Sequence, residues 1–164
     1  MEKERKVAII GGTGLTELQD LEIVRSEVIM TPYGEPSSPV SYGVLGDSDK
    51  EIVFLARHGH THNIPPHKVN YRANLWVLNH IGINTIIAVN AVGGIREDML
   101  PGSLVLPNQI IDYTTRRVNT FFEDNLTHVT HIDFSYPYSK DLSHLVIESA
   151  DKEHIELLQN YSVF

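Results

Sequence analysis

The stretch Val7-Ala8-Ile9-Ile10-Gly11-Gly12-Thr13-Gly14 decides the fold class, because it joins a short β-branched run to a glycine-rich turn. Residues 7–10 predict a buried strand that ends at the glycines. Glycines let backbone N–H groups approach an anion closely, and the Thr13 hydroxyl adds a donor. The turn is neither a dinucleotide fingerprint, since Glu17 replaces its last glycine, nor a Walker loop, since no Gly-Lys-Ser/Thr follows. Alone, it is more typical of an ordinary turn than of a phosphate site.

The elements predicted further along the chain alternate between strands and helices. The apolar run 85–89 predicts a central strand that is covered on both faces. We therefore expect a single α/β domain over residues 1–164, with a mixed central β-sheet flanked by helices. The other predicted elements are strands at 21–29, 40–45, 51–55 and 103–106, helices at 69–81 and 141 to about 158, and a long loop at 115–137.

Composition restricts the class of ligand. The chain has 13 Lys and Arg against 21 Asp and Glu, and its formal net charge of -8 disfavours nucleic acid and anionic membranes as partners. There is no cysteine, so neither disulfides nor thiolate metal sites are available. No run approaches the roughly 18 apolar residues of a membrane span, and no signal peptide is evident, so we expect a cytoplasmic protein with a small-molecule substrate.

The segment ARHGHTH at 56–62 follows a predicted strand directly and carries a possible anion site. The planar guanidinium of Arg57 suits phosphate, and His58 beside it can donate a hydrogen bond or exchange a proton. The alternating histidines also resemble a metal cluster, but no acidic residue stands nearby. Another alternative is the phosphohistidine motif of the histidine phosphatases, although that motif follows the first strand of its fold. Ligands in open α/β sheets bind where strands end, which favours a site here.

Two further segments carry candidate residues. NAVGGI at 90–95 follows the most strand-like run, and its small residues free the backbone for a polar ligand. We expect this turn, the first glycine turn and the Arg57 turn to converge at one edge of the sheet. In the long loop, His131 and Asp133 are a candidate acid/base pair, or simply solvated polar residues.

Six motifs occur in the same order as in a known family: IIGGTGL at 9–15, TPYG at 31–34, LARHGH at 55–60, VNYRANLW at 69–76, NAVGGI at 90–95 and HVTHIDFS at 128–135. Together they resemble the methylthioadenosine phosphorylase branch of the trimeric purine nucleoside phosphorylases. The last two motifs look closest to the methylthioinosine phosphorylases. The resemblance covers about residues 6–150 and is much more specific than any single motif.

The resemblance implies purine salvage by phosphorolysis of S-methyl-5'-thioinosine or S-methyl-5'-thioadenosine. Inorganic phosphate is then the co-substrate, with no metal or organic cofactor, and the products are a free purine and 5-methylthioribose 1-phosphate. In the family, Thr13 and Arg57 correspond to residues that hold phosphate oxygens, and His58 to a further donor. Ala91 corresponds to a backbone N–H donor, and Asn90 to a residue between phosphate and sugar.

The resemblance also bears on assembly and on completeness. The position of His131 reaches the 5′-substituent pocket of a neighbouring subunit in the family, which implies a homotrimer. Family members continue beyond this length, and their later residues hold the sugar and the purine. We therefore expect a C-terminally truncated domain that lacks the leaving-group residue, has little activity alone and leaves the purine preference open. The alternatives are a histidine-phosphatase-like phosphohydrolase and a non-catalytic phosphate-binding remnant.

Overall fold

The computed structural model describes residues 6–12, 15, 20–46, 48, 50–115, 117–124 and 126–163. The chain forms two compact units, which are treated separately below: unit 1 is Met1–Val92 with Arg116–Phe121, and unit 2 is Gly93–Thr115 with Phe122–Phe164. The single domain expected from the sequence stays a prediction. None of the helices in the described part of the chain is long and apolar enough to span a lipid bilayer.

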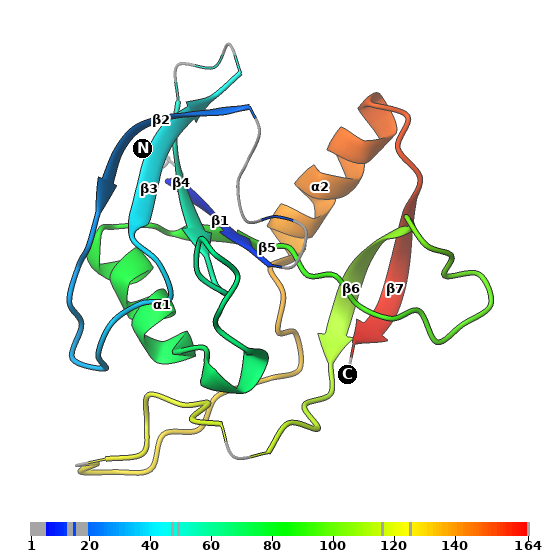
Figure 1. The fold of residues 1–164 in the computed structure, drawn as a ribbon. Coiled ribbons are helices and arrows are strands. Elements are labelled where there is room, and N and C mark those ends of the chain that lie inside the picture. Colours follow the sequence, from blue (N-terminus) through cyan, green and yellow to red (C-terminus); the bar gives the residue numbers. More distant parts are fainter. Residues whose placement is uncertain are drawn as a thin grey trace. The chain divides into compact units, whose positions relative to one another are not determined.

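Unit 1 is built on a five-stranded sheet with the strand order β2-β3-β4-β1-β5 (Figure 1). β1 runs parallel to both β4 and β5, whereas β3 is antiparallel to β2 and to β4. This confirms the predicted α/β fold with a mixed central sheet. The strands are β1 Val7–Gly11, β2 Leu21–Glu27, β3 Val40–Leu45, β4 Glu51–Ala56 and β5 Thr85–Ala88.

Helix α1 (Tyr71–His80) contributes Val77 and Leu78 to the core of unit 1, where both side chains are fully buried. They belong to one apolar cluster with residues of β1, β3 and β4, including Leu55. The helix begins two residues later than predicted because the Asn70 side chain caps it, accepting a hydrogen bond from the backbone N–H of Ala73 at 3.1 Å. A short 3₁₀ turn, Pro66–Lys68, precedes this cap.

β5 departs from the prediction of a central strand. In the described sheet it pairs only with β1 and is the last strand, and its residues are half-buried or exposed rather than covered on both faces. The apolar run correctly indicated a strand, but apolarity does not determine how many neighbours a strand has. Its sequence, Thr-Ile-Ile-Ala, offers none of the charged side chains that commonly protect a sheet edge.

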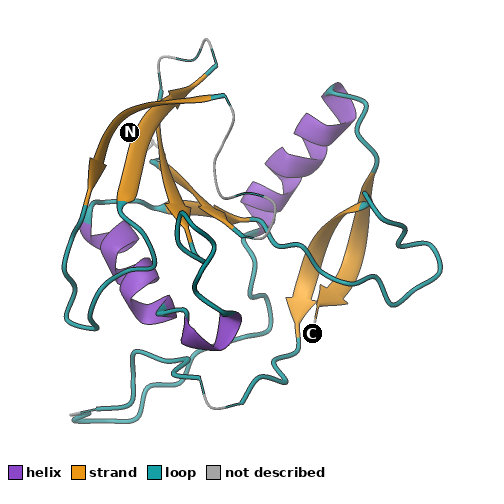
Figure 2. Cartoon of the chain, in the orientation of Figure 1, coloured by secondary structure: helices purple, strands orange, loops and turns teal. Residues whose placement is uncertain are grey.

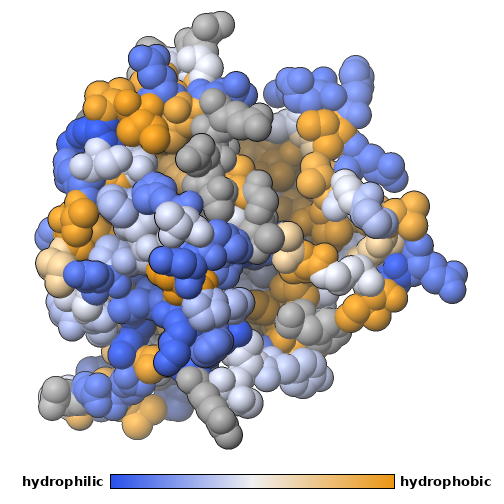
Figure 3. Space-filling view, viewed as in Figure 1, coloured by the Kyte–Doolittle hydropathy of each residue, from blue (hydrophilic) through white to orange (hydrophobic). Residues whose placement is uncertain are grey.

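The opposite edge strand, β2, has charged side chains as well as apolar ones. Arg25 lies over the ring of Tyr42 at 3.7 Å and forms an ion pair with Glu27 at 2.8 Å. Ile23 and Val24 of β2 are 56% and 69% exposed. Apolar and polar side chains are interspersed over the upper left of the face that Figure 3 shows. The two edge strands therefore differ, since β2 carries charged side chains and β5 carries none.

Unit 2 contains a second sheet of two parallel strands, β6 (Leu104–Ile110) and β7 (Leu157–Val163), and the helix α2 (Lys140–Lys152). The predicted helix extending to about residue 158 was wrong at its end, since α2 stops at Lys152 and a strand follows. β6 is longer than predicted, with register shifts around Pro107. The predicted loop at 115–137 is confirmed for its described residues, which contain neither helix nor strand (Figure 2).

The two helices end in the same way, although only one end is visible in the sequence. At α1, Gly82 has a φ of 85°, and the N–H groups of Gly82 and Ile83 bond to the carbonyls of Asn79 and Leu78. This is the Schellman arrangement, for which glycine is the usual residue. At α2, His154 takes the left-handed position with a φ of 55°, and the same pair of hydrogen bonds forms. A histidine gives no stop signal, so the helix was predicted too long.

Substitutions at these two left-handed positions should change the free energy of unfolding in opposite directions. Gly82→Ala places a Cβ at a positive φ and should lower the free energy of unfolding by about 1 kcal/mol. His154→Gly relieves the same strain and should raise it by roughly 0.5–1 kcal/mol. Urea unfolding followed by circular dichroism measures both changes. A change of the same sign in the free energy of unfolding of both variants would contradict a shared Schellman geometry.

Candidate functional site

The three turns predicted to converge begin at one edge of the unit 1 sheet. Within the parallel strands, Ile10 pairs with Leu55 on one side and with Ala88 on the other. The next residues, Gly11 and Ala56, are also paired, so the turns after β1, β4 and β5 start at the same level. Parallel strands thus bring together the segments that carry the predicted phosphate ligands. Of these ligands, Thr13 lies outside the described residues.

Arg57 connects all three turns. Its backbone N–H donates to the Gly11 carbonyl at 3.0 Å, and its side-chain Nη1 donates to the Val89 carbonyl at 2.9 Å. The guanidinium also lies against Gly12, so closely that a Cβ at that position would overlap it. One side chain therefore touches the residue after β1 and the residue after β5 while its own backbone continues β4.

The charge of Arg57 is half-buried and has no acidic partner in the described structure. Burial lowers the pKa of the Arg57 guanidinium, and the nearby Tyr71 opposes this shift. Arginine nevertheless stays protonated in proteins, so the site keeps its positive charge. Among the described residues, Arg57 takes part in no ion pair, unlike Arg25 and Arg96. A desolvated cation without a carboxylate is a good receptor for an added anion.

Gly12→Ala should weaken anion binding without destabilising the fold. The new methyl group would displace the Arg57 guanidinium, which is the flexible end of a side chain, and leave the backbone in place. We expect phosphate affinity to fall about tenfold, with less than about 0.5 kcal/mol change in the free energy of unfolding. Calorimetric titration and urea unfolding measure the two quantities. Unchanged affinity would show that the observed guanidinium position is irrelevant to binding.

His58 is fixed by a turn that returns the chain toward β4. Its Nδ1 lies 2.7 Å from the carbonyl oxygen of Ile64, and the side chain is only 6% exposed. The turn uses Gly59 at a φ of 78°, and the Ile64 N–H donates back to the His58 carbonyl at 3.0 Å. The ring of His62 lies beside that of His58, with 4.9 Å between centroids. Within the described part of the chain, no three His, Asp or Glu side chains gather in a group that could hold a metal ion.

Asn90 and Ala91 follow Val89 and are both exposed. The Val89 N–H donates to the Ile10 carbonyl at 3.0 Å, which fixes the start of this turn beside β1. His131 is exposed in unit 2. The Asp133 carboxylate accepts a hydrogen bond from the Ser135 backbone N–H at 2.9 Å, and hydrogen bonding from Ser135 lowers its pKa. In the described structure no hydrogen bond joins Asp133 to His131, so the acid/base pair is not formed there.

A buried polar group that sequence reasoning missed supports the end of β4. The Ser38 hydroxyl accepts a hydrogen bond from the Ala56 N–H at 3.1 Å, one residue before Arg57. Asn74 on α1 accepts from the Ser37 N–H at 2.8 Å and donates to the Ser37 hydroxyl at 2.9 Å. Ser38 and Asn74 are 6% and 3% exposed. From the sequence, Ser38 is only a serine in a turn and Asn74 only a residue of a helix. No pattern indicates that either forms these buried hydrogen bonds.

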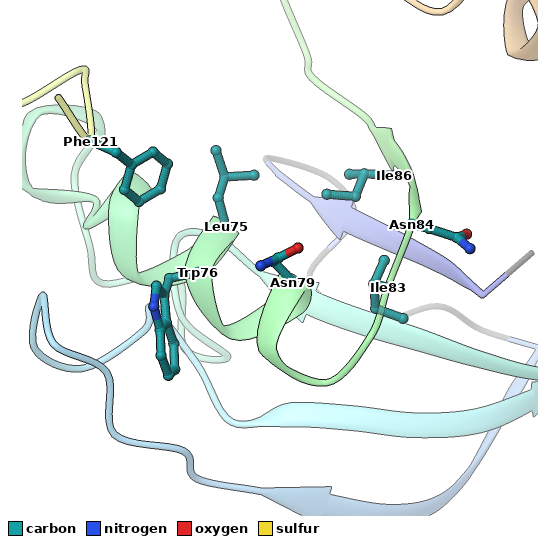
Figure 4. A pocket seen from close by; sticks show the side chains of 7 residues that line it. All are labelled: Leu75, Trp76, Asn79, Ile83, Asn84, Ile86 and Phe121. Atoms are coloured by element: carbon teal, nitrogen blue, oxygen red, sulfur yellow. The ribbon is translucent and has the colours of Figure 1, made fainter. Parts of the chain in front are cut away.

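A surface pocket of about 570 Å³ in unit 1 lies away from these turns. Leu75 and Asn79 of α1 and Ile86 of β5 line it (Figure 4), together with Ile83 and Asn84, which precede β5. The residues before a strand lie at its amino end, whereas the Arg57 turn lies at the carboxyl end of the parallel strands. The pocket is therefore not the anion site described here.

Comparison with known proteins agrees with this arrangement. Residues 6–160 match the model of the phosphorylase superfamily. The probable S-methyl-5'-thioinosine phosphorylase of Pseudomonas syringae pv. tomato is 55% identical over 135 residues, covering 82% of this chain and 54% of that protein. The S-methyl-5'-thioadenosine phosphorylase of Hyperthermus butylicus is 47% identical over 144 residues, covering 88% and 51%.

A solved structure shows the same fold. Methylthioadenosine phosphorylase from Schistosoma mansoni in complex with tubercidin superposes with a TM-score of 0.89 at 34% identity, covering 98% of this chain and 63% of that one. The chain thus spans about half the length of the curated relatives it matches. The family model matches nearly all residues of this chain, and the sheet of unit 1 carries the three turns at one edge. The chain belongs to the phosphorylase superfamily.

Proposed function

We propose that this chain forms the phosphate site of a nucleoside phosphorylase that cleaves S-methyl-5'-thioinosine or S-methyl-5'-thioadenosine. The observation that carries the proposal is the Arg57 guanidinium, which is half-buried, lacks an acidic partner among the described residues and touches the turns after β1 and β5. The names of the relatives supply the substrate class, since they are thioinosine and thioadenosine phosphorylases.

The proposed reaction needs a positioned anion rather than a metal or an organic cofactor. The bond between C1′ and the purine nitrogen breaks while a phosphate oxygen bonds to C1′, so that the purine leaves with the electron pair and takes up a proton. Positive charge develops on the sugar in the transition state, and a phosphate held below C1′ both stabilises it and attacks it. Arg57 fixes two oxygens of this phosphate in our proposal. His58, Thr13, Asn90 and the backbone N–H of Ala91 complete the site.

The proposal extends to assembly and compartment. We propose a cytoplasmic homotrimer in which His131 serves the 5′-substituent pocket of a neighbouring subunit. The exposure of His131 is compatible with such a role, since its side chain is accessible to a partner. Sedimentation of the protein and the effect of His131→Ala on the KM for the thionucleoside, with phosphate KM unchanged, test this part.

The phosphohydrolase and remnant alternatives are not favoured by the comparisons, because the relatives are phosphorylases and the superfamily match includes the Arg57-His58 segment. The two enzymatic chemistries differ in a simple respect. A phosphorylase consumes inorganic phosphate and needs a nucleoside, whereas a phosphohydrolase releases phosphate from a monoester without any nucleoside.

Two measurements test the proposed function. Calorimetric titration of the chain with inorganic phosphate should show one site per chain. Any purine that the protein releases from methylthioinosine or methylthioadenosine should require phosphate and should appear together with a new sugar phosphate signal in the ³¹P NMR spectrum. Failure to bind phosphate, or release of phosphate from p-nitrophenyl phosphate, would overturn the assignment.

A further inference from the structure

We infer that the anion site binds its ligand together with one proton, shared between the Nε2 of His58 and an anion oxygen. This inference rests on the proposed phosphate site and specifies its chemistry. The family resemblance implies only that His58 donates a hydrogen bond to phosphate. The geometry around its ring determines where the donated proton has to come from.

The first step concerns Nδ1. It lies 2.7 Å from the Ile64 carbonyl oxygen, which has no hydrogen to give, so the proton in this hydrogen bond belongs to Nδ1. A neutral imidazole carries one N–H only. The neutral form of His58 therefore has a bare lone pair at Nε2, which accepts hydrogen bonds and cannot donate one.

The second step concerns the accessibility of Nε2. His58 is 6% exposed, and its one side-chain hydrogen bond in the described structure is that to Ile64. Among the described residues, no buried side-chain nitrogen or oxygen is left without a partner, so Nε2 keeps contact with solvent. His58 directly follows Arg57, whose guanidinium marks the anion site. An almost fully buried ring thus presents one unpaired nitrogen.

The third step is the meeting of this nitrogen with a tetrahedral anion. A bare lone pair repels an unprotonated phosphate or sulfate oxygen, so the contact becomes favourable only when one proton lies between them. A phosphate that still carries its acidic proton brings this proton itself, and Nε2 accepts the hydrogen bond. Sulfate has no proton at neutral pH, so it has to bind to the charged imidazolium, which takes its proton from solvent.

The charged and titratable groups near His58 permit a clean test. Arg57 is permanently charged, and Tyr71 of α1 acts on its guanidinium. His62 touches the His58 ring, and His60 stands exposed in the same turn. Both are imidazoles in the same turn as His58, so each needs its own glutamine variant as a control.

Sulfate is the best probe because its own charge stays constant. In the wild-type chain, the dissociation constant for sulfate should rise with pH and approach a tenfold rise per pH unit under alkaline conditions. Calorimetry in buffers of different ionisation enthalpy should then show uptake of about one proton per sulfate bound. The amide of His58→Gln can donate at every pH. In this variant, both the pH dependence of the sulfate dissociation constant and the proton uptake should vanish. His60→Gln and His62→Gln should keep them.

The outcomes separate this inference from the proposed function. Absence of phosphate and sulfate binding in the wild type would overturn the phosphate site itself. Binding without proton uptake would leave the phosphate site intact and overturn the shared proton, because Nε2 would then already carry its own. His58→Asn is the second variant, since its amide can still donate toward Ile64 but has no group at the position of Nε2. It should bind sulfate weakly and without proton uptake.

Discussion

Replacing Arg57 with methionine is expected to weaken phosphate binding about 100-fold or more. The side chain supplies the charge of the site, and two charge-assisted hydrogen bonds to phosphate account for about 3 kcal/mol or more. Methionine keeps a similar length and volume, so the space beside Gly12 stays filled. Calorimetric titration with phosphate measures the loss.

Two matched variants control this result. Arg57→Lys keeps the charge but loses the planar fork and the contact with Val89, so we expect an intermediate loss of about tenfold. Arg96→Met changes the net charge of the chain equally, but Arg96 pairs with Asp98 in unit 2 and should leave affinity within about twofold. An Arg57→Met protein that still binds phosphate like the wild type would remove the main support for the proposed function.

Replacing Leu78 with alanine is expected to lower the free energy of unfolding of unit 1 by about 2–5 kcal/mol. Leu78 is fully buried in the cluster between α1 and the sheet, and a leucine-to-alanine change there removes apolar contacts and leaves a cavity. Trp76 is the sole tryptophan of the chain and lies on the same helix, so its fluorescence follows unit 1 during urea unfolding.

Leu75 offers the matched control on the same helix. It is 42% exposed and belongs to the wall of the surface pocket, so Leu75→Ala should cost less than about 1 kcal/mol. The same chemical change at positions three residues apart then differs only in burial. Similar losses for the two variants would show that α1 does not face the sheet as the structure has it.

The convergence of the three turns could be predicted from sequence because it follows from topology. Turns that follow parallel neighbouring strands share an edge. The strands predicted at 7–10, 51–55 and 85–89 end within one residue of the observed ends of β1, β4 and β5. The contacts that define the site were not predictable. No local pattern shows that Arg57 reaches Val89, that Ile64 takes the Nδ1 proton of His58, or that a serine hydroxyl binds the last N–H of β4.

The errors in the fold also have physical causes. β5 was expected at the centre of a sheet because its residues are apolar, but strand order depends on pairing between segments far apart in the chain. β7 was missed because the left-handed residue that follows α2 is His154 rather than a glycine, so the sequence gives no stop signal at the end of the helix. Where the stop was a glycine, as at Gly82, the end of the helix was predicted to within one residue.

The buried contacts of Ser38 and Asn74 have a kinetic and entropic consequence for ligand capture. They immobilise the backbone just ahead of the Arg57 turn in the absence of any ligand, using groups that water cannot easily displace. Little ordering of this segment then remains to be done when an anion arrives, which favours a small entropic penalty on association. Ser38→Ala would free the Ala56 amide to exchange its hydrogen and transfer that ordering cost to the binding step.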